Sequence, residues 1–290
     1  MNDRFLRQMA LFGKEGQEKL GLAHVTVVGV GGLGTPVVQQ LALLGVGNLA
    51  LIDSEELDTT NRNRYVGAWH DDPIPGSKKV NLAKRLVNLI DPDIRVETLD
   101  DSFVSNRGFE LITNADYVFG CLDSEGARLV LNELCAAYAR PLFDLASDIV
   151  SGSTPNYGGR VCVAWDGNGC IVCWGLLDTE EAQSDLAGPN ERRDREAIYG
   201  IQRQALGRSG PSVVSINGVV ASLGVTEFMV AIAGVRAPKR LITYYGHMGR
   251  LTAPLEEPAP DCYYCKGIRG QRGEADVERY IRDGVGAYLR

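Results

Sequence analysis

Residues 29–34 read GVGGLG, and they separate the apolar run HVTVV (24–28) from the stretch TPVVQQLALL (35–44). The glycines at positions 29, 31 and 34 match the pattern G-x-G-x-x-G, in which a strand passes through a tight turn into a helix. A helix that starts at such a turn offers free N–H groups and the positive end of its dipole to a phosphate. The stretch predicts a nucleotide-binding loop formed by Gly29, Gly31, Gly32 and Gly34.

The loop by itself suits two kinds of cofactor. Asp53 ends the next apolar run, NLALI (48–52), where a carboxylate usually holds a ribose hydroxyl. NAD for hydride transfer and ATP for adenylyl transfer both carry a ribose and phosphates, so Asp53 does not separate them. A tight turn without any ligand is the third interpretation. The choice among the three depends on the residues that follow.

Composition and charge narrow the class of protein. The chain has 290 residues, of which 44% are hydrophobic and 23% charged, which is typical of a soluble globular protein. Its net charge of −7 argues against a nucleic-acid partner, which usually meets a basic face. We expect no membrane segment, since no run approaches about 20 apolar residues. Charged residues at positions 3, 4 and 7 argue against a secretory signal, so we expect a cytoplasmic protein.

The order of apolar runs indicates the fold. Short β-rich runs alternate with helical stretches between positions 25 and 149, which predicts βαβ units and a parallel sheet covered on both faces. Residues 157–165 and 239–246 are predicted as antiparallel strands. Residues 212–233 are predicted as a long buried helix. The charged stretch 178–210 is predicted as a loop or mobile crossover.

Charged residues downstream of the loop favour ATP over NAD. Adenylyl transfer brings an anionic carboxylate to an anionic triphosphate, so the site must neutralise charge. Asn61, Arg64 and Lys79 follow Asp53 and suit that task, since the fixed fork of an arginine matches a phosphate. Asp123 follows the run YVFG (117–120), at the edge where open α/β sheets bind ligands, and it is a candidate Mg²⁺ ligand. Taken one at a time, these residues also have structural interpretations. Arg64 could lie in a solvated loop, Lys79 could lie on the surface of a helix, and Asp123 could cap the helix that follows it.

Four of the seven cysteines form two C-x-x-C pairs. Cys170 and Cys173 make the first pair, and Cys262 and Cys265 make the second. This spacing is typical of a structural zinc site, and the long interval between the pairs predicts a clamp between distant segments. Four thiolates would leave no open position on the metal, so a catalytic zinc is not expected. Four unconnected thiols are the alternative.

Taken together, these motifs resemble the ubiquitin-activating-enzyme-like adenylyltransferases, the group of ThiF, MoeB and HesA. The resemblance runs from Arg4 to about Cys265. The matching motifs are RFLRQ (4–8), GVGGLG (29–34), DSE (53–55), TNRNRY (60–65), GSKKV (76–80) and CLD (121–123). Two positions depart from the family pattern. Glu55 replaces the usual second aspartate, and Tyr65 replaces the usual glutamine.

The resemblance implies a role for each matching residue. Asp53 would bind the ATP ribose, Glu55 would also belong to the cofactor-binding set, and Asn61, Arg64 and Lys79 would contact the phosphates. Asp123 would hold Mg²⁺ and support the transfer. Arg7 would reach the ATP of a partner subunit, which implies a homodimer. Arg7, Arg64, Lys79 and Asp123 are thus the expected catalytic set, and the four paired cysteines would hold structural zinc.

The implied fold is a Rossmann-like, mostly parallel α/β sheet with helices on both faces, extended by antiparallel strands and the zinc clamp. Residues 1–177 and 211–267 would form a single adenylation domain, 178–210 a crossover loop and 268–290 a C-terminal tail. The implied reaction is ATP-dependent adenylation of the C-terminal carboxylate of a small ubiquitin-like or sulfur-carrier protein. The products are an acyl adenylate and pyrophosphate.

Many relatives pass the activated partner to a cysteine in the crossover. Residues 176–260 contain no cysteine. We therefore expect adenylation without a crossover thioester, with transfer to an outside thiol or persulfide. The alternatives are a related adenylyltransferase that acts on another carboxylate, a peptide or tRNA, an NAD-dependent oxidoreductase, and a non-catalytic scaffold.

Overall fold

The computed structural model describes residues 3–150, 155–188, 211–254 and 257–289. Its strands are β1 His24–Val28, β2 Asn48–Ile52, β3 Arg95–Leu99, β4 Tyr117–Gly120, β5 Leu142–Val150, β6 Asn156–Ala164, β7 Leu241–Tyr245 and β8 Arg250–Thr252. Its α-helices are α1 Leu6–Leu22, α2 Gly34–Leu44, α3 Lys79–Ile90, α4 Asn106–Thr113, α5 Glu125–Ala137, α6 Thr179–Leu186, α8 Val214–Ile232 and α9 Arg279–Arg282. Short helical turns are η1 Asp3–Phe5, η2 Thr59–Asn61, η3 Gly246–Met248, η4 Tyr263–Gly267, η5 Arg272–Ala275 and η6 Val285–Ala287.

The strands form one sheet in the order β3-β2-β1-β4-β5-β6-β7-β8. The first five of these strands run parallel, and β6, β7 and β8 continue the sheet in antiparallel pairs. The chain moves outward from β1 to β3 and then returns to β4 on the other side of β1. Open α/β sheets bind ligands at the carboxyl ends of two strands that meet at such a reversal. The predicted sheet is therefore confirmed, and its topology singles out the ends of β1 and β4.

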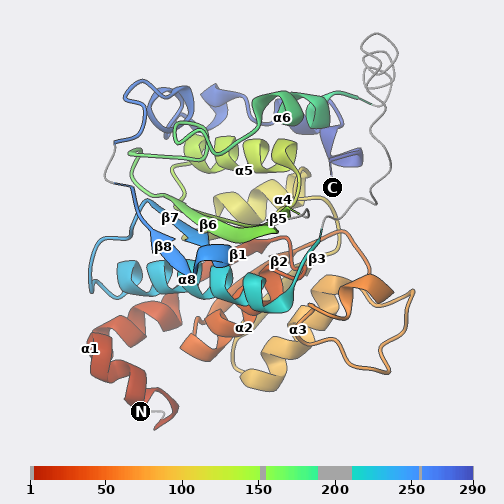
Figure 1. Ribbon diagram of the computed structural model, residues 1–290, viewed down its shortest axis with the longest axis vertical. Coiled ribbons are helices and arrows are strands. Elements are labelled where there is room, and N and C mark those ends of the chain that lie inside the picture. Colours follow the sequence, from red (N-terminus) through yellow and green to blue (C-terminus); the bar gives the residue numbers. More distant parts are fainter. Residues whose placement is uncertain (1–2, 151–154, 189–210, 255–256, 290) are drawn as a thin grey trace.

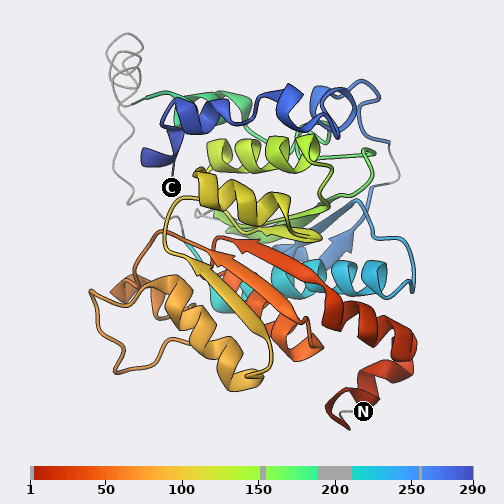
Figure 2. The ribbon, with the colours of Figure 1, turned by 180° about the vertical axis from the view of Figure 1, so that it is seen from behind.

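Helices cover both faces of the sheet. Helices α1, α2, α3 and α8 lie on one face, while α4, α5, α6 and the C-terminal segment lie on the other, as Figure 1 and the reverse view in Figure 2 show. Three buried phenylalanines join the layers, since the rings of Phe119 and Phe143 stack at 4.9 Å and Phe228 of α8 meets both edge-on. Each such pair contributes about 0.5–1.5 kcal/mol beyond the burial of its surface.

The helices begin and end at residues that typically cap or terminate helices. Gly45 follows α2 in the left-handed conformation, with φ 83°, as a glycine after a helix often does. Helix α3 ends at Ile90, directly before Asp91 and Pro92. Ser105 and Ser124 cap α4 and α5 by accepting a backbone N–H with their hydroxyl groups.

Two expectations need correction. The predicted crossover loop begins with a helix, α6, because Asp178 caps it by accepting the Glu181 N–H. The rest of that stretch, 189–210, lies outside the described residues. Helix α8 is long and apolar enough to cross a membrane by length and composition, contrary to the expectation that no run comes close. Half of its apolar window is buried against β5, β6 and α2, which is the packing of a core helix with one open face.

Candidate functional site

The glycine loop occupies the turn between β1 and α2. Gly29 has φ 86°, and a Cβ there would lie 2.6 Å from the Cys121 carbonyl oxygen. A Cβ at Gly34 would lie 1.9 Å from the carbonyl oxygen of Gly29. These two glycines are therefore required by the turn itself.

The doubled glycine has two different environments. A Cβ on Gly31 would meet no atom within 4 Å, so this position faces open space. A Cβ on Gly32 would lie 2.8 Å from Cγ of Arg64 and 3.0 Å from Nδ2 of Asn217. Gly31 therefore leaves room for a ligand, whereas Gly32 makes room for two side chains of the protein.

Asp53 is held directly beneath the loop. Its Oδ2 accepts the Val30 N–H at 2.9 Å, and its Oδ1 accepts the Glu55 N–H at 2.9 Å. Burial raises the pKa of Asp53 above the ordinary aspartate value, although the positive charge of Lys79 opposes this shift. The carboxylate thus joins the loop after β1 to the end of β2 and fixes their spacing.

Lys79 starts α3 and points at the same region. Its side chain is 7% exposed, and its ammonium group pairs with the carboxylate of Glu55, which is 60% exposed. The Lys79 N–H donates to the Glu55 carbonyl at 3.1 Å, so the two residues are joined through both backbone and side chain. The Tyr65 hydroxyl donates to the Lys79 carbonyl at 2.5 Å, which gives this departure from the family pattern a structural role.

Asn61 and Arg64 lie on the segment after β2. Asn61 accepts the Asp58 N–H in a capping box, so its Oδ1 already has a partner. Arg64 donates to the Thr60 carbonyl at 2.6 Å, and its aliphatic stem crosses Gly32. Arg62, between them, donates to the carbonyls of residues 70 and 72 and orders the loop that leads to α3.

Asp123 follows β4 and faces the same cluster from the other strand. Burial raises the pKa of Asp123, the negative charge of Glu55 raises it further, and Lys79 lowers it. The Cys121 carbonyl, two residues before Asp123, lies against Gly29, so Asp123 lies at the loop end of the sheet, where the charges of Lys79 and Glu55 act on it. The fold therefore brings Asp53, Glu55, Lys79 and Asp123 together, with Arg64 across Gly32.

Arg7 does not join this cluster within one chain. The next residue, Gln8, donates to the Leu44 carbonyl at the C-terminal end of α2. The glycine loop lies at the other end of α2, which has 11 residues and is therefore about 16 Å long. Arg7 is exposed at the edge of the molecule away from the loop.

The four paired cysteines do come together. Their Sγ atoms all lie within 4.8 Å of one another, and three of the pairs are separated by 3.7, 3.8 and 3.8 Å. Zinc bound at its usual distance of about 2.3 Å to sulfur in a tetrahedron separates its ligands by about 3.8 Å. The residues present thus fit structural zinc. A metal here would join the loop after β6 to the segment after β8.

The other three thiols are poorly suited to nucleophilic chemistry. Burial raises the pKa of Cys121, Cys135 and Cys162, because a thiolate is poorly solvated in an apolar surrounding. A raised pKa keeps the thiol protonated near neutral pH, where only the thiolate attacks.

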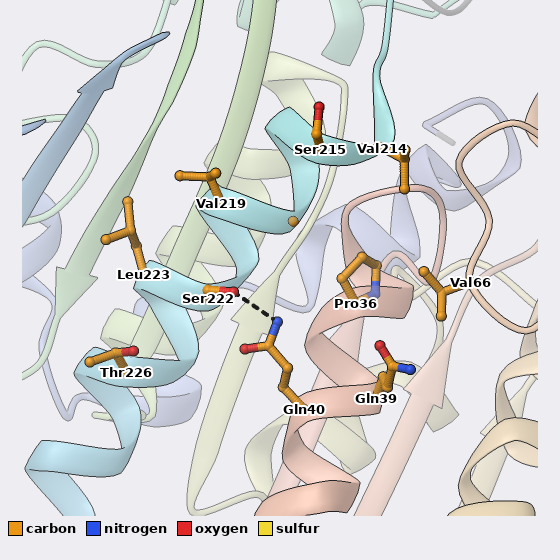
Figure 3. Close-up of a pocket in the computed structure, with 11 residues that line it drawn as sticks. Pro36, Gln39, Gln40, Val66, Val214, Ser215, Val219, Ser222, Leu223 and Thr226 are labelled. Carbon is orange, nitrogen blue, oxygen red and sulfur yellow. Dashed lines mark hydrogen bonds between the residues drawn. The ribbon is translucent and has the colours of Figure 1, made fainter. Parts of the chain in front are cut away.

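A groove lies on the face of the sheet that α2 and α8 cover, beside the charged cluster of Asp53, Glu55, Lys79 and Asp123. It is an open groove of about 550 Å³ between α2 and α8, and Pro36 and Val214, near the starts of these two helices, lie along it (Figure 3). Gln40 and Ser222 bridge it with a hydrogen bond of 3.1 Å. The residues that line the groove are mostly apolar or neutral, so it differs in chemistry from the charged cluster.

Two residues near the site, Asn217 and Asp185, are not among those predicted from the sequence. Asn217 is a buried amide in the apolar helix α8, and a polar residue inside an apolar run was the available signal. Asp185, on α6, accepts from the Ser124 hydroxyl and the Gly126 N–H next to Asp123. No pattern within the crossover predicts that contact.

The sequence model of the ThiF family matches residues 5–264 of this chain. Protein HesA, vegetative, of Trichormus variabilis is 36% identical over 53% of this chain and 61% of its own length. The sulfur carrier protein adenylyltransferase of Thermus thermophilus is 32% identical over 56% of this chain and 57% of its own. The matches thus span about three fifths of these relatives.

The fold also matches a solved structure. The Microcin C7 biosynthetic enzyme MccB in complex with N-formylated MccA superposes with a TM-score of 0.69. The match covers 91% of this chain and 75% of the other, at 22% identity. At that identity the likeness establishes a shared fold and nothing further.

Proposed function

This chain belongs to the ThiF family, and from that membership we propose that it adenylates the C-terminal carboxylate of a ubiquitin-like or sulfur-carrier protein. In this reaction a carboxylate oxygen attacks the α-phosphorus of ATP, and the bond between that phosphorus and the pyrophosphate oxygen breaks. The products are an acyl adenylate and pyrophosphate. The printed name of the Thermus thermophilus relative supports this substrate class.

The observation that carries the proposal is the charged cluster at the ends of β1, β2 and β4. Lys79 and Arg64 supply positive charge beside a glycine loop, and Asp53 would hold the ribose. Glu55 pairs with the Lys79 ammonium, and the phosphates of ATP would compete with Glu55 for it. Such preorganised charges stabilise the transition state of a phosphoryl-group displacement.

We propose that Asp123 holds Mg²⁺ when ATP is bound. Mg²⁺ usually takes one or two carboxylates together with phosphate oxygens and water. Burial raises the pKa of Asp123, and repulsion by the negative charge of Glu55 raises it further. A divalent cation would relieve that repulsion. Its chemical contribution would be to neutralise the phosphates.

We further propose that an outside thiol or persulfide attacks the acyl carbon of the adenylate, forms a bond to sulfur and releases AMP. Of the described cysteines outside the clamp, Cys135 and Cys162 are buried and Cys121 is partly exposed, and desolvation raises the pKa of all three thiols. The sequence between the two cysteine pairs contains no cysteine. An external nucleophile would then complete the transfer without a crossover thioester.

The assay for this proposal is pyrophosphate exchange. Purified protein, MgATP and a candidate carrier should move labelled pyrophosphate into ATP, and Asp123→Asn should reduce exchange at least about a hundredfold, since it removes charge from the metal ligand. Asp116→Asn is a matched control, because Asp116 precedes β4 at its opposite end. Full exchange by Asp123→Asn, or none with any carrier, would refute the assignment. Exchange with a short peptide alone would favour the peptide alternative.

A homodimer that shares Arg7 is part of the same proposal. Arg7 lies too far from its own loop to act there, and a second copy could supply it. Arg7→Ala and Asp123→Asn subunits are each expected to be inactive. Random mixing should restore about a quarter of wild-type activity, because half of the dimers would hold one intact site. No recovery in a mixture that demonstrably exchanges subunits would show that Arg7 does not act across a dimer.

A further inference from the structure

One buried amide connects the glycine loop to the sheet and to the segment that leaves the crossover. Asn217 lies in the first turns of α8, and its side chain is 2% exposed. Its Oδ1 accepts the Ser147 hydroxyl of β5 at 2.7 Å. Its Nδ2 donates to the Ser212 hydroxyl at 3.0 Å. Ser212 is the second described residue after the crossover stretch 189–210.

The same amide nitrogen borders the phosphate loop. The position that a Cβ would take on Gly32 lies 3.0 Å from Nδ2 of Asn217 and 2.8 and 2.9 Å from Cγ and Cδ of Arg64. Asn217 and the stem of Arg64 therefore pack on the same side of Gly32. A shift of the amide would open space beside Gly32, into which the flexible arginine stem could move.

The two hydrogen bonds fix the amide in one orientation. Burial makes an unpaired donor or acceptor costly, so a satisfied buried amide has one preferred position. Ser147 comes from the sheet and is a rigid anchor, whereas Ser212 belongs to the chain that emerges from the crossover. The position of that chain is thus linked, through one side chain, to Gly32 and Arg64.

We propose that Asn217 is a positioning residue that sets the path of the Arg64 side chain across Gly32 and so determines how tightly the site binds the ATP phosphates. This inference rests on the proposed function, since it concerns the nucleotide of that same site. It adds that the exit of the crossover is coupled to the phosphate site. The ligand concerned is the triphosphate of MgATP.

A role limited to fastening α8 onto β5 makes a different prediction. Loss of Asn217 would then lower stability and leave the ATP affinity of the folded protein unchanged. A positioning role acts through Arg64, so it disappears once the guanidinium is removed. A double-mutant cycle on ATP affinity separates the two.

The experiment titrates MgATP by calorimetry into wild type, Asn217→Leu, Arg64→Met and the double variant. Methionine keeps most of the arginine stem and removes its charge. We expect Asn217→Leu to weaken ATP binding about tenfold and to add less than about twofold in the Arg64→Met background. Unchanged affinity of Asn217→Leu, or effects that multiply in the double variant, would overturn the inference.

Two further variants guard against misfolding. Asn132→Leu replaces an equally buried amide, 2% exposed, on α5, and it should bind ATP as wild type does. Ser212→Ala removes only the link to the crossover exit, and it should weaken ATP binding about threefold and lower the melting temperature by a few degrees, because it leaves a buried donor without its acceptor. If Asn217→Leu does not fold, unchanged affinity of Ser212→Ala overturns the coupling. Wild type that binds MgATP but exchanges no pyrophosphate refutes the proposed reaction alone, whereas wild type that binds no MgATP refutes both.

Discussion

The glycines of the loop meet different physical demands. Gly29 and Gly34 lie against backbone carbonyl oxygens, so any side chain there would force the turn apart. Gly32 accommodates two side chains, and Gly31 faces open space. A shared motif therefore contains positions required by the fold and a position that is free to meet a ligand.

Substitutions in the loop should separate these demands. Gly34→Ala should lower the free energy of unfolding by about 3 kcal/mol, because its Cβ overlaps a backbone oxygen. Gly31→Ala should leave the unfolding free energy within about 1 kcal/mol of wild type and weaken MgATP binding at least about tenfold. Urea unfolding and calorimetric titration measure the two effects. Tight ATP binding by Gly31→Ala would show that phosphate does not approach this glycine.

Asp123 should make stability depend on pH. Its pKa is raised in the folded protein, chiefly by burial and then by Glu55, so ionisation at neutral pH opposes folding. Stability associated with the protonated carboxyl is present at acid pH and is lost as pH rises through the raised pKa. Asp123→Asn should therefore melt above wild type at pH 7, and the difference should vanish below about pH 4. Thermal unfolding across this range, without nucleotide, tests it; equal melting temperatures at pH 7 would contradict the argument.

At the scale of elements, α5 organises one face of the sheet. It carries Ser124 at its start, next to Asp123, and Glu133 in its buried middle. The C-terminal segment packs on it, since Tyr280 and Arg279 both contact Glu133. The predicted tail is thus a packed part of this layer, and its end meets α6 through the Tyr288 hydroxyl and the carbonyl of residue 186.

Leu289 provides a test of that packing. Its side chain is 2% exposed, and it lies beside Gly126 at the start of α5. Leu289→Ala should lower the free energy of unfolding by about 2 to 4 kcal/mol through lost burial and the cavity left behind. Leu22→Ala, at a residue 75% exposed, should change it by less than about 0.5 kcal/mol. Similar urea midpoints for the two variants would argue that the segment does not stabilise the fold.

At the scale of the whole molecule, the four-cysteine clamp joins segments far apart in sequence. Two of the contacts between the pairs, Cys170 with Cys262 and Cys173 with Cys265, link cysteines 92 positions apart. Beyond β8 the chain returns to the α5 face, and the clamp lies where it turns back. A metal would hold this return in place and so support the layer that carries Asp123.

Metal content and stability should therefore fall together. Cys262→Ser should reduce bound zinc from about one ion per chain to none and lower the melting temperature, because metal binding contributes folding free energy. Cys135→Ala removes a buried thiol outside the clamp and should retain zinc. Elemental analysis with thermal unfolding measures both. Zinc at full occupancy in Cys262→Ser would exclude this cluster as its site.

The sequence by itself determined the strand–turn–helix around Gly29, the alternation of the parallel strands and the pairing of the cysteines. These features depend on local backbone demands, on hydrophobic periodicity and on the ligand chemistry of thiols, all of which are visible at short range. Only the tertiary structure decided that Gly32 faces Asn217, that α6 lies against the start of α5 and that Arg7 is remote from its own loop. Those relations are contacts between segments distant along the chain, and such contacts leave no periodic pattern in either segment.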